Sequence, residues 1–189
     1  MVGGVRERQH GTIWVSCFVR QKLKEFTGYG QTLRVVSLHP DIGYPWHAVS
    51  WADGGRLLVC HGGVGADARR VVSVGMDGRG TAVYALAKSP GSPTSAGGPP
   101  CGGGHPNSPV HAAVDADNFV VLVDCDNRLL TLLDPDLGFV RDLVNPRPGD
   151  DSGAAGISLK DPRRVCLDTD NNRVYVGDGS GSVYVIELK

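Results

Sequence analysis

The sequence lacks long apolar runs and lacks the periodicity of an amphipathic helix. No stretch reaches the roughly 18 consecutive apolar residues that a membrane-spanning helix needs, so we expect no contact with a membrane. The N-terminal residues carry charges but no apolar core of a secretion signal. No stretch of useful length repeats its apolar residues with a helical period of about 3.6, which favours strands over helices.

Cysteine is scarce, and its pattern argues against both disulfides and metal sites. The chain has five cysteines, an odd number, scattered over expected strands and turns. We interpret them as reduced thiols, which indicates a cytoplasmic protein. The sequence contains no array of cysteines and histidines such as a RING or B-box module requires. Cys101 and His105 supply only two of the four ligands of a structural zinc site, so we expect no metal and no cofactor.

A strong net charge is also missing, although the charge is unevenly spread. The whole chain has a formal charge of −1. Residues 1–40 contain six basic and two acidic residues, whereas residues 109–189 contain eight basic and fourteen acidic ones. Binding to phosphates depends on Lys and Arg, so the acidic half argues against a broad nucleic-acid surface. A protein is therefore the favoured partner, and RNA is the alternative.

What the sequence does contain is a repeat. One copy begins at Pro109 and another at Pro162, which is 53 residues later, and the two align without a gap. A third copy begins at Pro45, 64 residues before the first of these. Repetition at such a period is typical of solenoids and propellers.

Each copy consists of short apolar stretches separated by turns rich in Asp, Asn and Gly, which are typical of hairpins. In the middle copy we expect strands over 110–114, 119–123, 129–133 and 139–144. The apolar residues run almost continuously, which suits strands covered on both faces. Four short antiparallel strands in about 40–50 residues form the blade of a β-propeller. We therefore predict an all-β fold, a β-propeller of four-stranded antiparallel blades with about four blades present.

We expect residues 1–189 to form a single propeller domain. Its expected parts are a partial blade at 11–39, a blade at 45–88, a flexible insert at 89–108, a blade at 109–144, a loop at 145–158 and a blade at 159–189. The last blade lacks a fourth strand, and an unpaired strand edge invites pairing with another chain. Three interpretations stay open: a fragment of a five- or six-bladed ring, a compact four-bladed ring, or a ring completed by another chain.

The repeated pattern resembles the NHL repeat. Both later copies place Asp-x-Asp-Asn a few residues after the proline, and the middle copy continues with Asn127 and Arg128. NHL repeats form the C-terminal propellers of tripartite-motif proteins and their relatives. The resemblance implies a non-enzymatic interaction domain, as in ubiquitin-ligase substrate recognition or post-transcriptional regulation. The last copy departs from the pattern, because Gly-Ser-Gly-Ser stands where the family places its arginine.

The repeated aspartates are better explained by turns than by catalysis. They are Asp115, Asp117, Asp168 and Asp170. A catalytic group is needed once, whereas a turn-capping group is needed in every blade, so we interpret all four as turn residues.

Function is expected where the copies differ, in the inserts after Lys88 and Val144 and above all in the loops that join second and third strands. We predict a partner-binding surface there, because binding groups concentrate on loops held by a rigid scaffold. Its residues are His61, Arg69, Arg70 and Arg128 in these loops, together with Tyr44 and Trp46 at the entrance of a blade. The alternative is that the tryptophan packs between blades and the arginines are merely solvated.

We predict no catalytic residue. Cys60 shows no base with an orienting partner nearby in the sequence, so a nucleophilic role is not favoured. Two alternatives to a binding domain are kept: a metal-dependent propeller enzyme of the lactonase or lyase type, and a truncated product without function.

Overall fold

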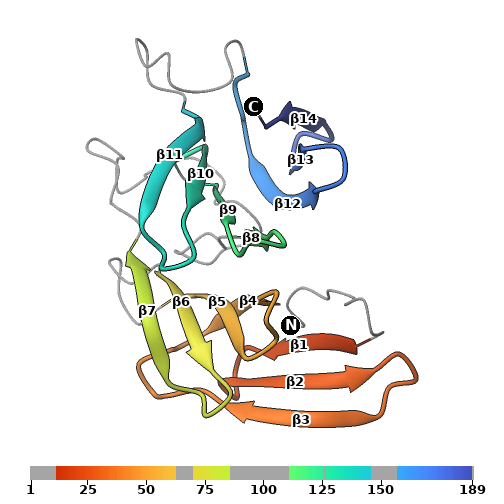
Figure 1. The fold of residues 1–189 in the computed structure, drawn as a ribbon, viewed down its shortest axis with the longest axis vertical. Coiled ribbons are helices and arrows are strands. Elements are labelled where there is room, and N and C mark those ends of the chain that lie inside the picture. Colours follow the sequence, from red (N-terminus) through yellow and green to blue (C-terminus); the bar gives the residue numbers. More distant parts are fainter. Residues whose placement is uncertain (1–11, 63–69, 86–110, 126, 146–156, 189) are drawn as a thin grey trace. The chain divides into compact units, whose positions relative to one another are not determined.

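The structure is a computed structural model, and it describes residues 12–62, 70–85, 111–125, 127–145 and 157–188. Every regular element within these residues is a β-strand, and the strands form four antiparallel sheets (Figure 1). No helix in this part of the chain is long and apolar enough to cross a membrane. The predicted all-β fold is confirmed.

The chain divides into two compact units, Met1–Ala85 and Leu86–Lys189. Each unit contains one three-stranded and one four-stranded sheet. The strands of each sheet lie inside one of the expected blade ranges, and the single propeller domain stays a prediction. The expected insert at 89–108 lies outside the described residues, as does most of the expected loop at 145–158.

In both sheets of the first unit, strands that follow one another along the chain also lie side by side. The three-stranded sheet consists of β1 (Thr12–Cys17), β2 (Lys22–Thr27) and β3 (Thr32–Ser37). The four-stranded sheet consists of β4 (Pro45–Ser50), β5 (Arg56–His61), β6 (Arg70–Gly75) and β7 (Gly80–Ala85). Such up-and-down antiparallel sheets are what short strands joined by tight hairpins produce.

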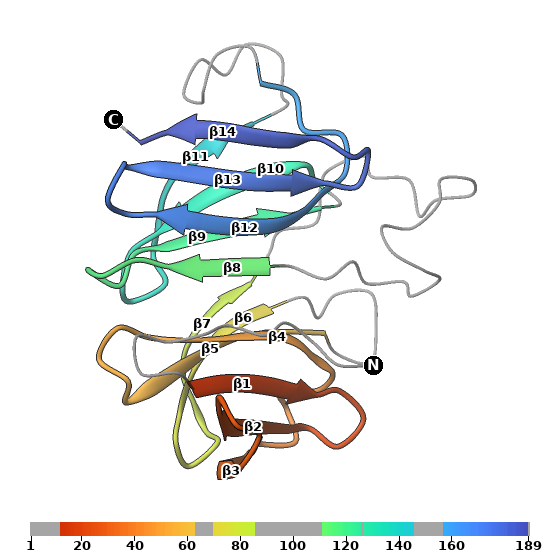
Figure 2. The ribbon, with the colours of Figure 1, turned by 90° about the vertical axis from the view of Figure 1, so that its right-hand side faces the viewer.

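The second unit repeats this arrangement (Figure 2). Its four-stranded sheet consists of β8 (His111–Val114), β9 (Val120–Asp124), β10 (Leu129–Leu133) and β11 (Phe139–Val144). Its three-stranded sheet consists of β12 (Pro162–Asp168), β13 (Arg173–Asp178) and β14 (Val183–Glu187). The strands expected in the middle copy agree with the observed ones to within one residue at each end.

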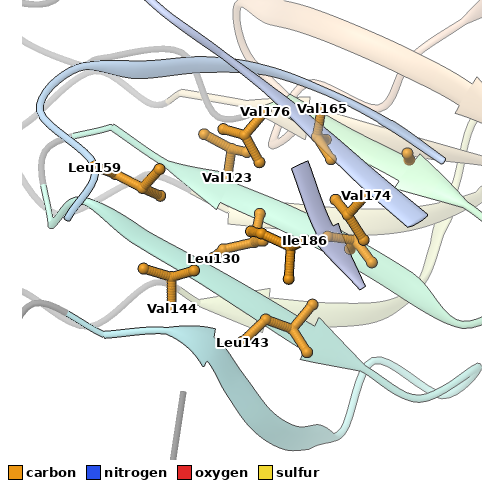
Figure 3. Close-up of a cluster of buried hydrophobic side chains, with 11 residues drawn as sticks. Val123, Leu130, Leu143, Val144, Leu159, Val165, Val174, Val176 and Ile186 are labelled. Carbon is orange, nitrogen blue, oxygen red and sulfur yellow. The ribbon is translucent and has the colours of Figure 1, made fainter. Parts of the chain in front are cut away.

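Each unit has its own apolar core. In the first unit the core includes Trp14, Leu23, Val36, Ala48, Leu57, Val59, Val72 and Val74. In the second unit it lies between the two sheets and includes Val121, Val123, Leu130, Leu143, Leu159, Val165, Val174, Val176 and Ile186 (Figure 3). All five residues of β9 are buried, which explains why its apolar run is continuous rather than alternating.

The turns confirm the structural interpretation for two of the four repeated aspartates, Asp115 and Asp168. Asp115 Oδ1 accepts the backbone N–H of Asp117 at 3.0 Å and that of Phe119 at 2.7 Å. Asp168 Oδ1 accepts the N–H of Asn171 at 3.2 Å. These carboxylates satisfy backbone donors that a tight turn leaves without strand partners, so they stabilise each hairpin.

One expectation about cysteine is wrong. Cys125 is disulfide-bonded, whereas Cys17, Cys60 and Cys166 are free. The odd cysteine count gave no sign of this bond, because disulfide pairing depends on distances that the fold creates.

Candidate partner-binding surface

Four of the six predicted binding residues lie at one end of the sheet β4–β7. Pro45 pairs with His61 across β4 and β5, and His61 pairs with Arg70 across β5 and β6. Tyr44 directly precedes this row, and Trp46 lies at the register shift that begins β4. Hairpin pairing therefore brings together residues that are up to 26 positions apart in the sequence.

The remaining two predicted residues are placed elsewhere or not described. Arg69 lies outside the described residues. Arg128 lies in the second unit, in the turn between β9 and β10. Its side chain is exposed, and its backbone φ is 56°. Its N–H donates to the Cys125 carbonyl at 3.2 Å, which closes that turn.

An aromatic cluster is the main feature of the start of β4. The Phe18 ring lies 4.9 Å from the Tyr44 ring and 4.5 Å from the Trp46 ring, measured between centroids, at interplanar angles of 39° and 50°. Tilted pairs at these separations are favourable geometries for aromatic rings. Ser16 Oγ also donates to the Trp46 carbonyl at 3.4 Å, so β1 and the start of β4 are joined by both polar and aromatic contacts.

Tyr44 has an unusual backbone. Its φ is 50°, in the left-handed region that residues with a Cβ adopt uncommonly. The N–H of Gly62 donates to the Tyr44 carbonyl at 3.4 Å, which ties this residue to the end of β5. Tyr44 is 38% exposed, so the strained backbone presents a large aromatic side chain to solvent. Strain of this kind tends to collect at functional sites.

The hairpin between β1 and β2 extends the apolar surface. The N–H of Arg20 donates to the Cys17 carbonyl at 3.2 Å and closes the turn, which leaves Val19 at its tip with 84% of its surface exposed. We call Phe18, Val19, Tyr44 and Trp46 the aromatic patch. Phe18 and Val19 were missed in the sequence because they belong to a different sheet. The only available signal was an apolar residue at a hairpin tip, where polar residues are usual.

His61 is buried behind this surface, with 6% of its side chain exposed. Burial lowers the pKa of His61, and the positive charge of Arg70 lowers it further, while hydrogen bonds to backbone groups of Gly62 and Gly43 act in the opposite direction. The net effect favours the neutral ring at neutral pH. Nδ1 lies 3.4 Å from the Gly62 carbonyl. His61 can therefore act in binding only indirectly, by positioning the backbone at Gly62.

Two exposed arginines belong to the elements around the aromatic patch. Arg20 and Arg70 are both exposed, the first in the β1–β2 turn and the second at the start of β6. The surface thus combines aromatic rings with cationic groups, a composition that is enriched at protein interfaces.

In the second unit the loop after β13 is held by a buried carboxylate. Asp178 Oδ2 accepts the N–H groups of Asp161 at 2.8 Å and Lys160 at 3.1 Å, and its Oδ1 accepts the N–H of Ser180 at 2.9 Å. Burial alone would raise the pKa of Asp178, but the hydrogen bonds from Ser180 and from these backbone groups outweigh it and lower the pKa to about 2.

Among the described residues, no group of three or more His, Cys, Asp or Glu side chains could hold a metal ion. Cys60 is fully buried, and this burial raises the pKa of its thiol, which favours the unreactive protonated form.

Comparison with known proteins identifies the fold and leaves the family open. No protein-family model and no curated protein matches the sequence. A Bacteroides caccae protein of unknown function has a TM-score of 0.69 and 13% identity over 98% of this chain and 63% of its own. Virginiamycin B lyase from Staphylococcus aureus has a TM-score of 0.53 and 15% identity over 99% of this chain and 55% of the lyase. The chain thus spans less than two thirds of either protein. Both have propeller-like folds, and the chain is a partial β-propeller of antiparallel blades, as predicted.

Proposed function

We propose that this protein is a non-enzymatic interaction domain that binds a protein partner through the aromatic patch. The observation that carries the proposal is the cluster in which Phe18 contacts both Tyr44 and Trp46 beside an exposed Val19. Tyr, Trp and Arg are the residue types that most often dominate binding energy at protein interfaces.

The rigidity of the patch supports a binding role. Two tilted ring contacts fix the Phe18 side chain, and the Gly62–Tyr44 hydrogen bond holds the backbone of Tyr44 in its left-handed conformation. A surface that is ordered before the partner arrives loses less conformational entropy on binding. The exposed Arg20 and Arg70 favour a partner segment that carries acidic residues next to apolar ones.

The resemblance of the repeats to NHL repeats supports a finer role. In that role the domain recognises substrates for a ubiquitin ligase or acts in post-transcriptional regulation, and other domains supply any catalysis. A protein partner is preferred to RNA because the best-matching repeats, at 109–189, carry eight basic and fourteen acidic residues. A propeller enzyme of the lactonase or lyase type is the second candidate, and a truncated product without function is the third.

A peptide-display selection on the immobilised protein tests the proposal. We expect peptides with apolar and acidic residues to be enriched on the unaltered protein and lost on Val19→Asp, because the substitution places a carboxylate within the patch. The matched control is Leu33→Asp on β3, where a 54% exposed apolar residue lies outside the patch. Equal enrichment on both variants would contradict the proposal.

Two further measurements separate the alternative functions. Tight binding of single-stranded RNA that weakens steeply with salt would replace the protein partner with RNA. A rise in melting temperature with calcium or zinc that a chelator abolishes would favour the metal-dependent enzyme.

A further inference from the structure

The strand β14 differs from β3, β7 and β11, which are the last strands of the other three sheets. It ends the three-stranded sheet β12–β13–β14, and no described strand pairs with its outer edge (Figure 2). The strands β3, β7 and β11 are each paired with their neighbour through at least one register shift, whereas β14 pairs with β13 without any. Bulges, lysines and prolines are the usual protection of sheet edges, and β14 contains none of them.

The hydrogen bonds at both ends of β14 define which backbone groups face outward. Ser182 accepts from Asp178 at 2.9 Å, and Leu188 donates to Asn172 at 2.8 Å, so even-numbered residues bond to β13. Because the pattern alternates in an antiparallel pair, Val183, Val185 and Glu187 direct their N–H and C=O groups to the outer edge. Their side chains are also exposed, with values of 65% for Val183 and 48% for Val185.

We propose that this edge pairs with β14 of a second copy of the chain to form a symmetric antiparallel dimer. Only one two-fold register brings the outward N–H and C=O groups of all three residues opposite those of the second copy. This register is centred on Val185. In that register Val185 lies opposite Val185 of the second copy, and Val183 lies opposite Glu187. Each outward residue then exchanges both backbone hydrogen bonds with its opposite residue.

The side chains suit this register as well. Two β-branched valines meet at the centre, which is a favourable cross-strand pair. The two Glu187 side chains lie at opposite ends of the pairing, so their like charges stay apart, and each remains beside Arg173 of its own copy at 3.5 Å. A strand of five residues buries less area than a standard interface, so we expect a reversible dimer with a dissociation constant on the order of 10 µM.

Sedimentation velocity of the full chain from 1 to about 300 µM tests the proposal. We expect a reversible shift from monomer to dimer, and Val185→Lys should weaken the dimer at least about tenfold, because it places two ammonium groups opposite each other. The control is Val35→Lys on β3, which is also an outer strand of a three-stranded sheet. Val35 is 47% exposed, and its substitution should leave the dimer unchanged.

Amide hydrogen exchange on the unaltered chain tests the dimer without a substitution that could disturb folding. The N–H groups of Val183, Val185 and Glu187 should gain protection as concentration rises, whereas those of Tyr184 and Ile186 are protected throughout. Protection that is independent of concentration would assign the edge to a segment of the same molecule. A chain that stays monomeric, an open-ended polymer, or an equal effect of Val35→Lys would also overturn the dimer.

Discussion

At the scale of single residues, Tyr44 has a strained backbone and an exposed aromatic ring that is available for binding. Its φ of 50° suits glycine better than tyrosine, and its ring contacts Phe18 while it remains 38% exposed. The buried Leu137 has a similar φ of 65°, so the exposed ring rather than the φ supports a role in binding. We propose that binding explains why a large aromatic side chain occupies the position.

This gives a prediction that separates stability from function. Tyr44→Gly removes the strain together with the ring contact, so we expect the free energy of unfolding to stay within about 1 kcal/mol of the unaltered value. Affinity for selected peptides should nevertheless fall at least about tenfold, because the aromatic anchor is lost. Denaturant unfolding and peptide titration measure the two quantities, and retained affinity would contradict the assignment.

Asp178 provides a prediction about pH. Its pKa in the folded protein is about 2, below the usual value of about 3.9 in an unfolded chain, so its ionised form stabilises the fold. The contribution, about 2 kcal/mol, is fully present above about pH 4 and is lost as pH falls towards 2.

Asp178→Asn should abolish that part of the acid dependence, because the amide cannot ionise. Chemical unfolding between pH 2 and pH 7 measures it, with Asp170→Asn as a control on an exposed turn residue of the same sheet, in the connection between β12 and β13. An unchanged acid profile in Asp178→Asn would show that other carboxylates dominate.

At the scale of strands and turns, the hairpins were predictable because their chemistry is local. Asp115 and Asp168 bond to N–H groups two to four residues ahead, so the Asp-x-Asp-Asn pattern was enough to predict each turn and the strands beside it. The aromatic patch was only half predictable, because Phe18 reaches Tyr44 across two sheets. The burial of His61 was equally hidden, since it depends on pairing between β4, β5 and β6.

The turn between β6 and β7 shows how one glycine fixes two neighbouring segments. Gly78 has a φ of 82°, and a Cβ there would collide with the Ser37 carbonyl at the end of β3. The Gly78 carbonyl also accepts the N–H of His39 at 2.9 Å.

Gly78→Ala should therefore destabilise the first unit by about 3 kcal/mol or more, from strain and collision together. Gly30→Ala is a matched control, because Gly30 has the same φ of 82° and nothing within 4 Å of the added carbon. It should cost about 1 kcal/mol from strain alone. Thermal unfolding of both variants measures the difference, and equal losses would mean that the close approach to Ser37 is relaxed at little cost.

At the scale of the whole molecule, the repeat predicted the architecture but not the function. A period of 53 residues, with turn residues at fixed places, was sufficient for an all-β propeller. The same repetition removes information about function, since residues that recur in every blade are scaffold. The copies differ at the start of β4. There Tyr44 and Trp46 contact Phe18 of the hairpin between β1 and β2.

The affinity of one selected peptide for three forms of the protein tests the central claim most directly. The forms are the unaltered chain, Tyr44→Ala and Tyr29→Ala. Tyr29 is the matched control, because it is 98% exposed at the tip of the hairpin between β2 and β3, in the same sheet. The binding patch predicts at least about a tenfold weaker affinity for Tyr44→Ala and an unchanged affinity for Tyr29→Ala. Equal affinity in all three forms would show that the aromatic patch is not the binding surface.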